Sequence, residues 1–125
     1  MSKIIQLKTL SGERGRLTVM DNIQTLLPFA VKRIFYIYDV DASDRGGHRH
    51  KKTLQAAICI KGSCVVVSNN GIHQEQFLLD TPDKCLILYP EDWHIMKEFS
   101  KDALFLVFAS ECYDPNDYIF EPYSS

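Results

Sequence analysis

The chain has 125 residues, of which 46% are hydrophobic and 24% are charged, and its formal net charge is −2. These values indicate one folded domain over residues 1–125 and exclude a disordered or collagen-like chain. The weakly acidic balance also excludes the broad basic field that attracts nucleic acid. No apolar run reaches the ~20 residues of a membrane span, and no signal-peptide core follows Met1, so we expect a cytoplasmic protein without a membrane partner.

Short apolar stretches separated by turn signals run along almost the whole chain, and they predict β-strands. Residues 3–10 (KIIQLKTL) come first, as a candidate edge strand. Residues 21–30 offer at most one helical turn before Pro28. Glycine-containing turns at Gly62 and Gly71 indicate hairpins, so we expect an all-β sandwich or barrel of antiparallel strands. The other predicted strands are, in chain order, residues 16–20, 34–40, 54–60, 64–68, 74–79, 84–89 and 103–109.

The four cysteines lie within or beside apolar stretches and show no CxxC spacing; they are Cys59, Cys64, Cys85 and Cys112. This pattern favours buried, reduced thiols over a disulfide framework or a zinc site.

The C-terminal segment "YDPNDYIFEPYSS", residues 113–125, is polar but rich in aromatic side chains. A loose tail is one interpretation of such a segment. Large aromatic side chains gain more from burial than from exposure, so we expect this segment to pack on the barrel.

The stretch "RGGHRHKKTLQ" carries the chemistry that stands out most in the sequence. On a strand, His48 and His50 point to one face and Arg49 points to the other. Two imidazoles on one face suit metal binding or proton transfer, because an imidazole titrates near pH ~6.5. A structural role on the surface also fits a bare His-x-His pattern.

The spacing after this pair resembles the first cupin motif, in which four residues separate HxH from a glutamate and six more precede a glycine. Gln55 stands at the glutamate position, and Gly62 matches the glycine. A second stretch, "PEDWH", resembles the second cupin motif, but Asp92 replaces its glycine and His94 comes one residue early. The resemblance implies a jelly-roll β-barrel. A neutral amide is a poorer ligand than a carboxylate, so we expect no bound metal and no cofactor.

Five segments, in order, resemble the sugar nucleotide 3,4-ketoisomerases, a metal-independent branch of the cupins. That resemblance implies an enzyme that moves the keto group of dTDP-4-keto-6-deoxyglucose from C4 to C3 through an enediol. The hydrogen and the electrons stay within one molecule, so the chemistry needs no redox cofactor. The matching segments are "ERGRLTV", "LPFAVKRIFYIYDV", "RGGHRHKKTLQAAICIKGSCVVV", "PEDWHIM" and "YDPNDYIFEPY".

The same resemblance implies roles for individual residues. His48 matches the general base that takes the C3 proton, and His50 matches the group that shuttles protons among the sugar oxygens. Tyr36 matches an active-site tyrosine beside them. For the substrate's diphosphate we expect Arg33 and Arg45, because a guanidinium can make two parallel bonds to phosphate oxygens.

Two further positions match residues that line the region near C4 in relatives, namely Arg16 and His94. This pairing resembles the enzymes that give a galacto-configured 3-keto sugar. The product would feed an aminotransferase that makes 3-amino-3,6-dideoxy sugars for surface glycans such as the O-antigen of lipopolysaccharide. Relatives form homodimers with exchanged N-terminal strands, and residues 3–10 are consistent with such an exchange.

Three other functions stay open from the sequence. A sugar nucleotide 3,5-epimerase also uses a histidine base and a tyrosine, and it would leave the ketone at C4. A non-catalytic cupin would bind the sugar nucleotide without exchanging its C3 hydrogen. A metal-dependent oxygenase is disfavoured by Gln55 at the glutamate position.

Overall fold

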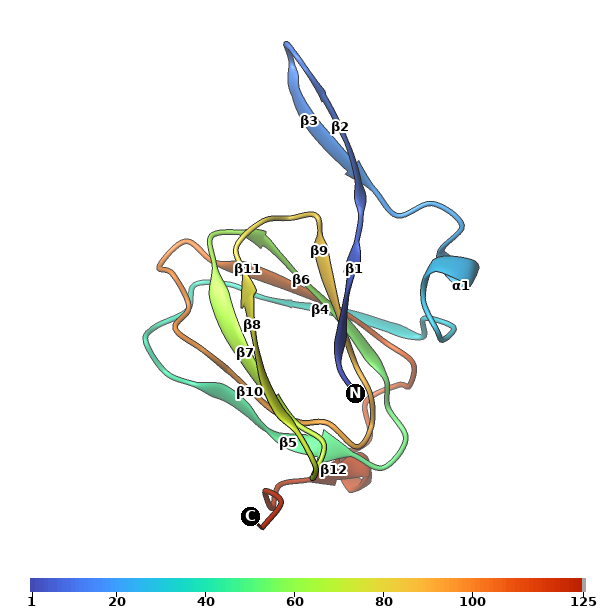
Figure 1. The fold of residues 1–125 in the computed structure, drawn as a ribbon, viewed down its shortest axis with the longest axis vertical. Helices are drawn as coiled ribbons and strands as arrows, with labels where there is room; N and C mark the ends of the chain where they lie inside the picture. The colour runs from blue at the N-terminus through green and yellow to red at the C-terminus, as the bar shows by residue number, and fades with distance from the viewer. Residues whose placement is uncertain (125) are drawn as a thin grey trace.

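The computed structural model describes residues 1–124 and consists almost entirely of antiparallel strands, which confirms the all-β prediction (Figure 1). Each strand of the barrel except β10 and the short N- and C-terminal ones coincides with a predicted apolar stretch or with the stretch that carries His48 and His50. The apolar pattern does not predict β10, which carries His94. The strands are β1 (Lys3–Gln6), β2 (Lys8–Gly12), β3 (Gly15–Val19), β4 (Arg33–Ile37), β5 (Arg45–His50), β6 (Gln55–Lys61), β7 (Cys64–Asn69), β8 (Gln74–Leu79), β9 (Lys84–Leu88), β10 (Trp93–Lys97), β11 (Leu104–Ala109) and β12 (Tyr118–Ile119).

Ten strands form two five-stranded sheets that enclose the core. One sheet has the order β1-β9-β6-β11-β4, and the other has the order β12-β5-β10-β7-β8. Apolar side chains of both sheets meet between them; Leu86 and Phe105 from the first sheet and Val66 from the second are fully buried in one cluster. In β7 buried residues alternate with half-buried ones, as expected for a strand with one face on the core.

The first sheet is covered on part of its outer face as well. Short helix α1 (Ile23–Leu26) and its flanks pack there on Ala56, Ile58 and Ile87. Residues 55–59 of β6 are therefore buried on both faces, which explains why their sequence is almost continuously apolar. Within residues 1–124, neither α1 nor any other helix is long and apolar enough to cross a bilayer.

The N-terminal region departs from the prediction of one strand over residues 3–10. β1 pairs with β9 of its own sheet, and the ladder stops at buried Leu7, whose backbone N–H donates to the Asp83 carbonyl at 2.8 Å. β2 and β3 then pair only with each other, as a hairpin that projects beyond the barrel (Figure 1). Leu10 and Leu17 on this hairpin are 54% and 57% exposed.

The cysteines follow the sequence-based expectation at three of four positions. All four thiols are free; Cys59, Cys64 and Cys85 are buried, whereas Cys112 is exposed. Cys112 follows β11 rather than lying within it, so it falls outside the alternation that buries the others.

Candidate active site

Three imidazoles meet between the two sheets. His48 and His50 point to the same face of β5, as their spacing predicts, and His94 comes from the adjacent strand β10 directly opposite His48. The ring centroid of His48 lies 4.9 Å from that of His50 and 4.9 Å from that of His94. The rings of His50 and His94 are 6.3 Å apart. The second cupin-like stretch thus supplies a third histidine to the cluster, despite its altered spacing.

A β-bulge in β5 sets which side chains accompany the histidines. His94 pairs with His48 and Ile95 pairs with Gly46, so Gly47 is an extra residue without a partner on β10. Both glycines have positive φ, 87° at Gly46 and 77° at Gly47. A Cβ at Gly46 would lie 3.0 Å from the backbone carbonyl oxygen of His94. The bulge therefore needs glycine, and it brings Arg45 to the same face as His48.

A cavity of about 180 Å³ opens beside this cluster. Pockets that enclose drug-sized ligands measure ~300–1,000 Å³, so this cavity suits one small group, such as a single sugar ring, rather than a whole nucleotide. His48, His94 and Arg45 line it, whereas His50 lies directly beside it without lining it. The other lining residues are Phe35, Ile37, Gly46, Gln55, Ala57, Leu88, Met96, Phe105, Val107 and Tyr118.

His50 is held by a buried carboxylate. The Nδ1 atom of His50 lies 2.9 Å from Oδ2 of Asp117, and Asp117 is 4% exposed. Burial lowers the pKa of His50, although the hydrogen bond and the charge of Asp117 oppose this effect. Burial alone would raise the pKa of Asp117, but hydrogen bonds from Thr53, Lys52 and His50 hold it below its usual value. The pair is thus a carboxylate beside a neutral imidazole at neutral pH.

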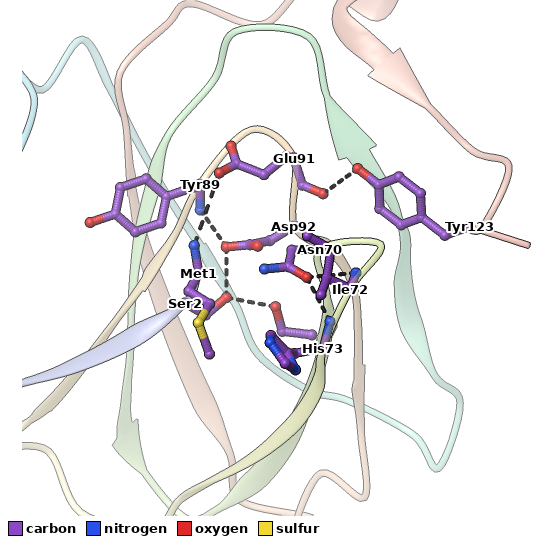
Figure 2. A network of polar contacts seen from close by, with 10 residues as sticks. Met1, Ser2, Asn70, Ile72, His73, Tyr89, Glu91, Asp92 and Tyr123 are labelled. Atoms are coloured by element: carbon purple, nitrogen blue, oxygen red, sulfur yellow. Dashed lines mark hydrogen bonds and ion pairs between the residues drawn. The ribbon is translucent and has the colours of Figure 1, made fainter. Parts of the chain in front are cut away.

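His94 follows a turn that is fixed by a network of polar contacts, and this network includes the N-terminal residue Ser2 (Figure 2). The Nδ1–H of His94 donates to the backbone carbonyl of Asp92 at 3.0 Å. The Asp92 carboxylate accepts from Ser2 Oγ at 2.7 Å and from the Tyr89 backbone N–H at 2.9 Å, which pins the turn before β10. Ser2 Oγ also lies 2.6 Å from Ser68 Oγ. Burial lowers the pKa of His94 to about 3.

His48, between the other two imidazoles, is also neutral. Burial and then the positive charge of a protonated His50 lower the pKa of His48 to about 4, and a hydrogen bond to the Gly46 backbone opposes this only in part. A neutral imidazole has a free lone pair on one ring nitrogen. The cluster therefore presents proton acceptors, not cations, at neutral pH.

The C-terminal segment packs on the barrel, as its aromatic side chains predict. A 3₁₀ turn, η1 (Pro115–Asp117), leads into β12, which pairs with β5. The ring of Tyr118 lies 4.7 Å from both His48 and His50. Further along, Trp93 Nε1–H donates to the Phe120 carbonyl at 3.1 Å, and the Tyr123 hydroxyl donates to the Glu91 carbonyl at 2.7 Å (Figure 2).

The structure corrects the prediction that Tyr36 lies beside the histidines. Tyr36 is 60% exposed on the outer face of β4, because side chains alternate along a strand. Its neighbours Phe35 and Ile37 point inward and line the cavity. The tyrosine that contacts the imidazoles is Tyr118, from the C-terminal segment.

The three predicted arginines lie in different places. Arg45 lines the cavity. Arg33 points inward from the end of β4, where its guanidinium lies 5.3 Å from the Phe35 ring and 5.8 Å from the Tyr113 ring. Arg33 is near enough for its charge to lower the pKa of His50. Arg16 is exposed on the projecting hairpin, and the described chain does not bring it to the cavity.

The donor set does not suit a metal ion. Gln55 lines the cavity at the position where the cupin motif has a glutamate, and it is buried. Across the described part of the chain, no three side chains of His, Cys, Asp or Glu are arranged so that they could hold an ion. The amide of Gln55 leaves the imidazoles with no adjacent carboxylate ligand on β6.

Sequence reasoning missed two residues of this cluster, Asp117 and Tyr118. Asp117 is 67 residues from His50 along the chain, so no local spacing relates them. The available signal was an acidic residue inside an aromatic segment that was expected to pack. A carboxylate that becomes buried needs a partner, which could have prompted a search for a histidine.

Comparisons with known proteins agree with this fold. Residues 1–124 match the family model described as FdtA: WxcM-like, C-terminal. The chain is 38% identical over 119 residues to a TDP-4-oxo-6-deoxy-alpha-D-glucose-3,4-oxoisomerase of Aneurinibacillus thermoaerophilus, and the match covers 94% of this chain and 85% of that protein.

Two solved structures are similar over nearly the whole chain. The WlaRB TDP-quinovose 3,4-ketoisomerase from Campylobacter jejuni superimposes with a TM-score of 0.89 at 38% identity, covering 96% of this chain and 92% of that one. The second structure is a histidine-to-asparagine variant of the 3,4-ketoisomerase QdtA from Thermoanaerobacterium thermosaccharolyticum, in complex with TDP-4-keto-6-deoxyglucose. It superimposes with a TM-score of 0.89 at 33% identity, covering 96% of this chain and 87% of that one.

Proposed function

We propose how this chain, which belongs to the family described as FdtA: WxcM-like, C-terminal, uses its histidine cluster in catalysis. The chain is a TDP-sugar 3,4-ketoisomerase, an intramolecular oxidoreductase that moves the keto group of TDP-4-keto-6-deoxyglucose from C4 to C3. The observation that carries the mechanism is the group of neutral imidazoles beside a cavity of sugar size.

The first step removes the proton on C3, which the neighbouring C4 carbonyl acidifies. His48 is the base: it lines the cavity, and its pKa of about 4 leaves its lone pair free at neutral pH. The electron pair of the C3–H bond forms the C3=C4 double bond, and the carbonyl electrons move to the C4 oxygen. The product of this step is an enediolate, and His48 is now an imidazolium.

The second stage moves one proton between oxygens and returns one to carbon. His50 takes the proton of the C3 hydroxyl at Nε2 and passes it to the C4 oxygen. C4 then takes the proton from the imidazolium of His48 while the C3 oxygen forms the new carbonyl. The reaction consumes and releases no proton or electron overall, so it balances without an oxidant. The proton that His48 holds exchanges with solvent before C4 is reprotonated. The Nε2 atom of His50 is buried and has no hydrogen-bond partner among residues 1–124, which supports a sugar hydroxyl as its partner.

The substrate's diphosphate lies outside the small cavity in this proposal. Arg45, which lines the cavity, and Arg33, close to His50, are the cations that meet it. A guanidinium holds phosphate oxygens through two parallel N–H donors. His94 completes the wall near C4 and, with Arg16, favours the galacto-configured product.

We propose that the chain works as a homodimer in which the β2–β3 hairpin crosses to a second copy. The hairpin pairs with no other strand of the described chain, and its Leu10 and Leu17 are more than half exposed. Ile34 and Tyr36, on the outer face of β4, are 57% and 60% exposed. A second copy would bury both sets of side chains and would bring Arg16 to a cavity.

We also propose a cytoplasmic location for the chain. Three buried, free cysteines (Cys59, Cys64 and Cys85) suit a reducing compartment, because closely placed thiols in an oxidising compartment tend to form disulfides. The 3-keto product is a substrate for an amino-group transfer, as in the synthesis of 3-amino-3,6-dideoxy sugars.

The experiment that tests this function mixes the protein with TDP-4-keto-6-deoxyglucose in D₂O and follows the sugar by NMR. We expect the carbonyl signal to move from C4 to C3, with deuterium incorporated at C4. Inversion at C3 and C5 with the ketone still at C4 would instead identify an epimerase. Binding without exchange of the C3 hydrogen would identify a non-catalytic sugar-nucleotide-binding protein.

A further inference from the structure

The carboxylate of Asp117 is more completely engaged than a structural role on a surface turn requires. Asp117 is 4% exposed, and its carboxylate lies next to three hydrogen-bond donors. One donor belongs to β5, and the other two belong to the segment that follows β5. The Lys52 backbone N–H donates to Oδ1 at 2.9 Å, and the hydroxyl of Thr53 donates to Oδ2. The third donor is Nδ1 of His50, 2.9 Å from Oδ2.

This arrangement fixes the tautomer of His50. An ionised carboxylate can only accept hydrogen bonds, so the proton of the neutral His50 ring must be on Nδ1. The other ring nitrogen, Nε2, then carries a lone pair. Within the described residues Nε2 is buried and has no partner, so nothing in the chain competes for that lone pair.

The surroundings of His50 would not select this tautomer without Asp117. The centroid of its ring lies 4.9 Å from that of His48 and 4.7 Å from that of Tyr118. Both of those side chains can donate or accept a hydrogen bond. Arg33, the nearby cation, can only donate hydrogen bonds. The carboxylate is therefore the group that distinguishes the two nitrogens.

We propose that Asp117 is a positioning residue that keeps His50 in the Nδ1–H tautomer, with its Nε2 lone pair ready to accept the sugar hydroxyl proton. The inference rests on the proposed function for its catalytic consequence, although the tautomer itself belongs to the free protein. Once Nε2 takes a proton, the negative charge of Asp117 also stabilises the imidazolium. A buried carboxylate behind a histidine acts in this way in serine proteases.

The first measurement needs no substrate. Nitrogen-15 spectra of the free wild-type protein at pH 7 report which nitrogen of each imidazole is protonated, and the chain has four histidines. The signals that disappear in His50→Asn belong to His50. We expect Nδ1 of His50 to be protonated and Nε2 to be unprotonated. The opposite assignment in the wild-type protein would overturn the inference, whatever the activity.

The second measurement uses Asp117→Asn, which keeps the size of the side chain. Its carbonyl oxygen can still accept from the Lys52 N–H, but its NH₂ group then faces Nδ1 of His50 and needs an acceptor there. We expect the spectrum of His50 to switch to the Nε2–H form. We expect kcat to fall at least ~10²-fold, as for loss of a positioned acid–base group, with the affinity for TDP unchanged.

Thr53→Val is the matched control, because it removes a hydrogen bond to the same carboxylate oxygen but leaves the carboxylate in place. We expect the Nδ1–H tautomer to persist in Thr53→Val and kcat to stay within about tenfold of wild type. Circular dichroism checks the folding of both variants. If Asp117→Asn keeps kcat within about threefold of wild type, or Thr53→Val switches the tautomer, Asp117 does not position His50. A wild-type protein with the expected tautomer but no ketoisomerase activity would refute the proposed function and not the tautomer.

Discussion

The histidine cavity and the β2–β3 hairpin differ in how much of their environment one chain provides. In the cavity, His50 is held by a hydrogen bond to Asp117, 67 residues along the same chain, and His94 by a hydrogen bond to the carbonyl of nearby Asp92. On the hairpin, Arg16 and its neighbours are exposed, and the strands pair only with each other. Proton transfer can therefore be organised within one chain, whereas the hairpin would find further contacts only in the proposed homodimer.

The largest expected effect lies in the cavity. His48→Asn removes the proposed base without a large change in volume, so we expect turnover to fall by ~10²–10⁴-fold or more, while TDP still binds. Steady-state kinetics and TDP titration measure the two properties. His73→Asn is the control, because His73 is exposed outside the cavity, and it should match wild type. Turnover in His48→Asn close to that of wild type would remove His48 from its role.

The hairpin can be tested by mixing variants. If Arg16 acts in the cavity of the partner subunit, Arg16→Ala should lose about tenfold in kcat/KM, the value of one charge-assisted hydrogen bond. Arg14→Ala, on the same hairpin, should lose much less. Co-refolded Arg16→Ala and His48→Asn chains should recover about a quarter of wild-type turnover, because each mixed dimer holds one intact site. No recovery on mixing would place Arg16 and His48 in the same subunit's site, whereas an Arg16→Ala variant as active as wild type would place Arg16 in no site.

The pH dependence of stability should follow the cavity and not the hairpin. The pKa of His48 is about 4 in the folded chain, against ~6.5 when unfolded, so the unfolded chain binds more protons between these values. Stability is therefore present above pH ~6.5 and declines as the pH falls toward 4. Thermal unfolding from pH 7 to pH 4 should show a falling Tm, with a shallower slope in His48→Asn. For Arg16→Ala, on the hairpin, we expect the Tm to fall with pH at the same slope as in the wild-type protein.

The smallest expected effect concerns the network at the N-terminus. Ser2→Ala removes one donor to the buried Asp92 carboxylate, which keeps its bond from Tyr89 N–H. We expect a loss of about 1 kcal/mol in the free energy of unfolding, with kcat almost unchanged, since the Asp92 carbonyl still orients His94. Denaturant titration measures this loss. A large fall in kcat would show that Ser2 supports His94 more directly.

Sequence reasoning predicted what depends on local periodicity. The alternation of apolar residues gave the strands, and the two-residue spacing gave the common face of His48 and His50. The same alternation, applied to residues 34–40, shows that Tyr36 and Phe35 lie on opposite faces but does not say which face is inward. Tyr36 was assigned inward by resemblance, and the structure places Phe35 there.

The remainder of the site depends on contacts that no local pattern encodes. Asp117 reaches His50 across 67 residues, and a single 3₁₀ turn between β11 and β12 decides its position. Arg45 would share the outer face with Arg49 in a regular strand, because both are odd-numbered positions. It faces the cavity only because the bulge at Gly46 and Gly47 adds one residue between Arg45 and His48.

Because of the glycine pair of β5, deletion of Gly47 should disturb the orientation of Arg45 less than a substitution at Gly46. Deletion of Gly47 removes the unpaired residue and restores a regular ladder in which Arg45 still lies opposite Met96, on the side of the imidazoles. A bulky residue at Gly46 cannot hold the positive φ, so the strand would straighten at full length and turn Arg45 outward. At this point in the barrel, loss of a codon would keep Arg45 facing the cavity, and a change of codon would turn Arg45 away from the imidazoles.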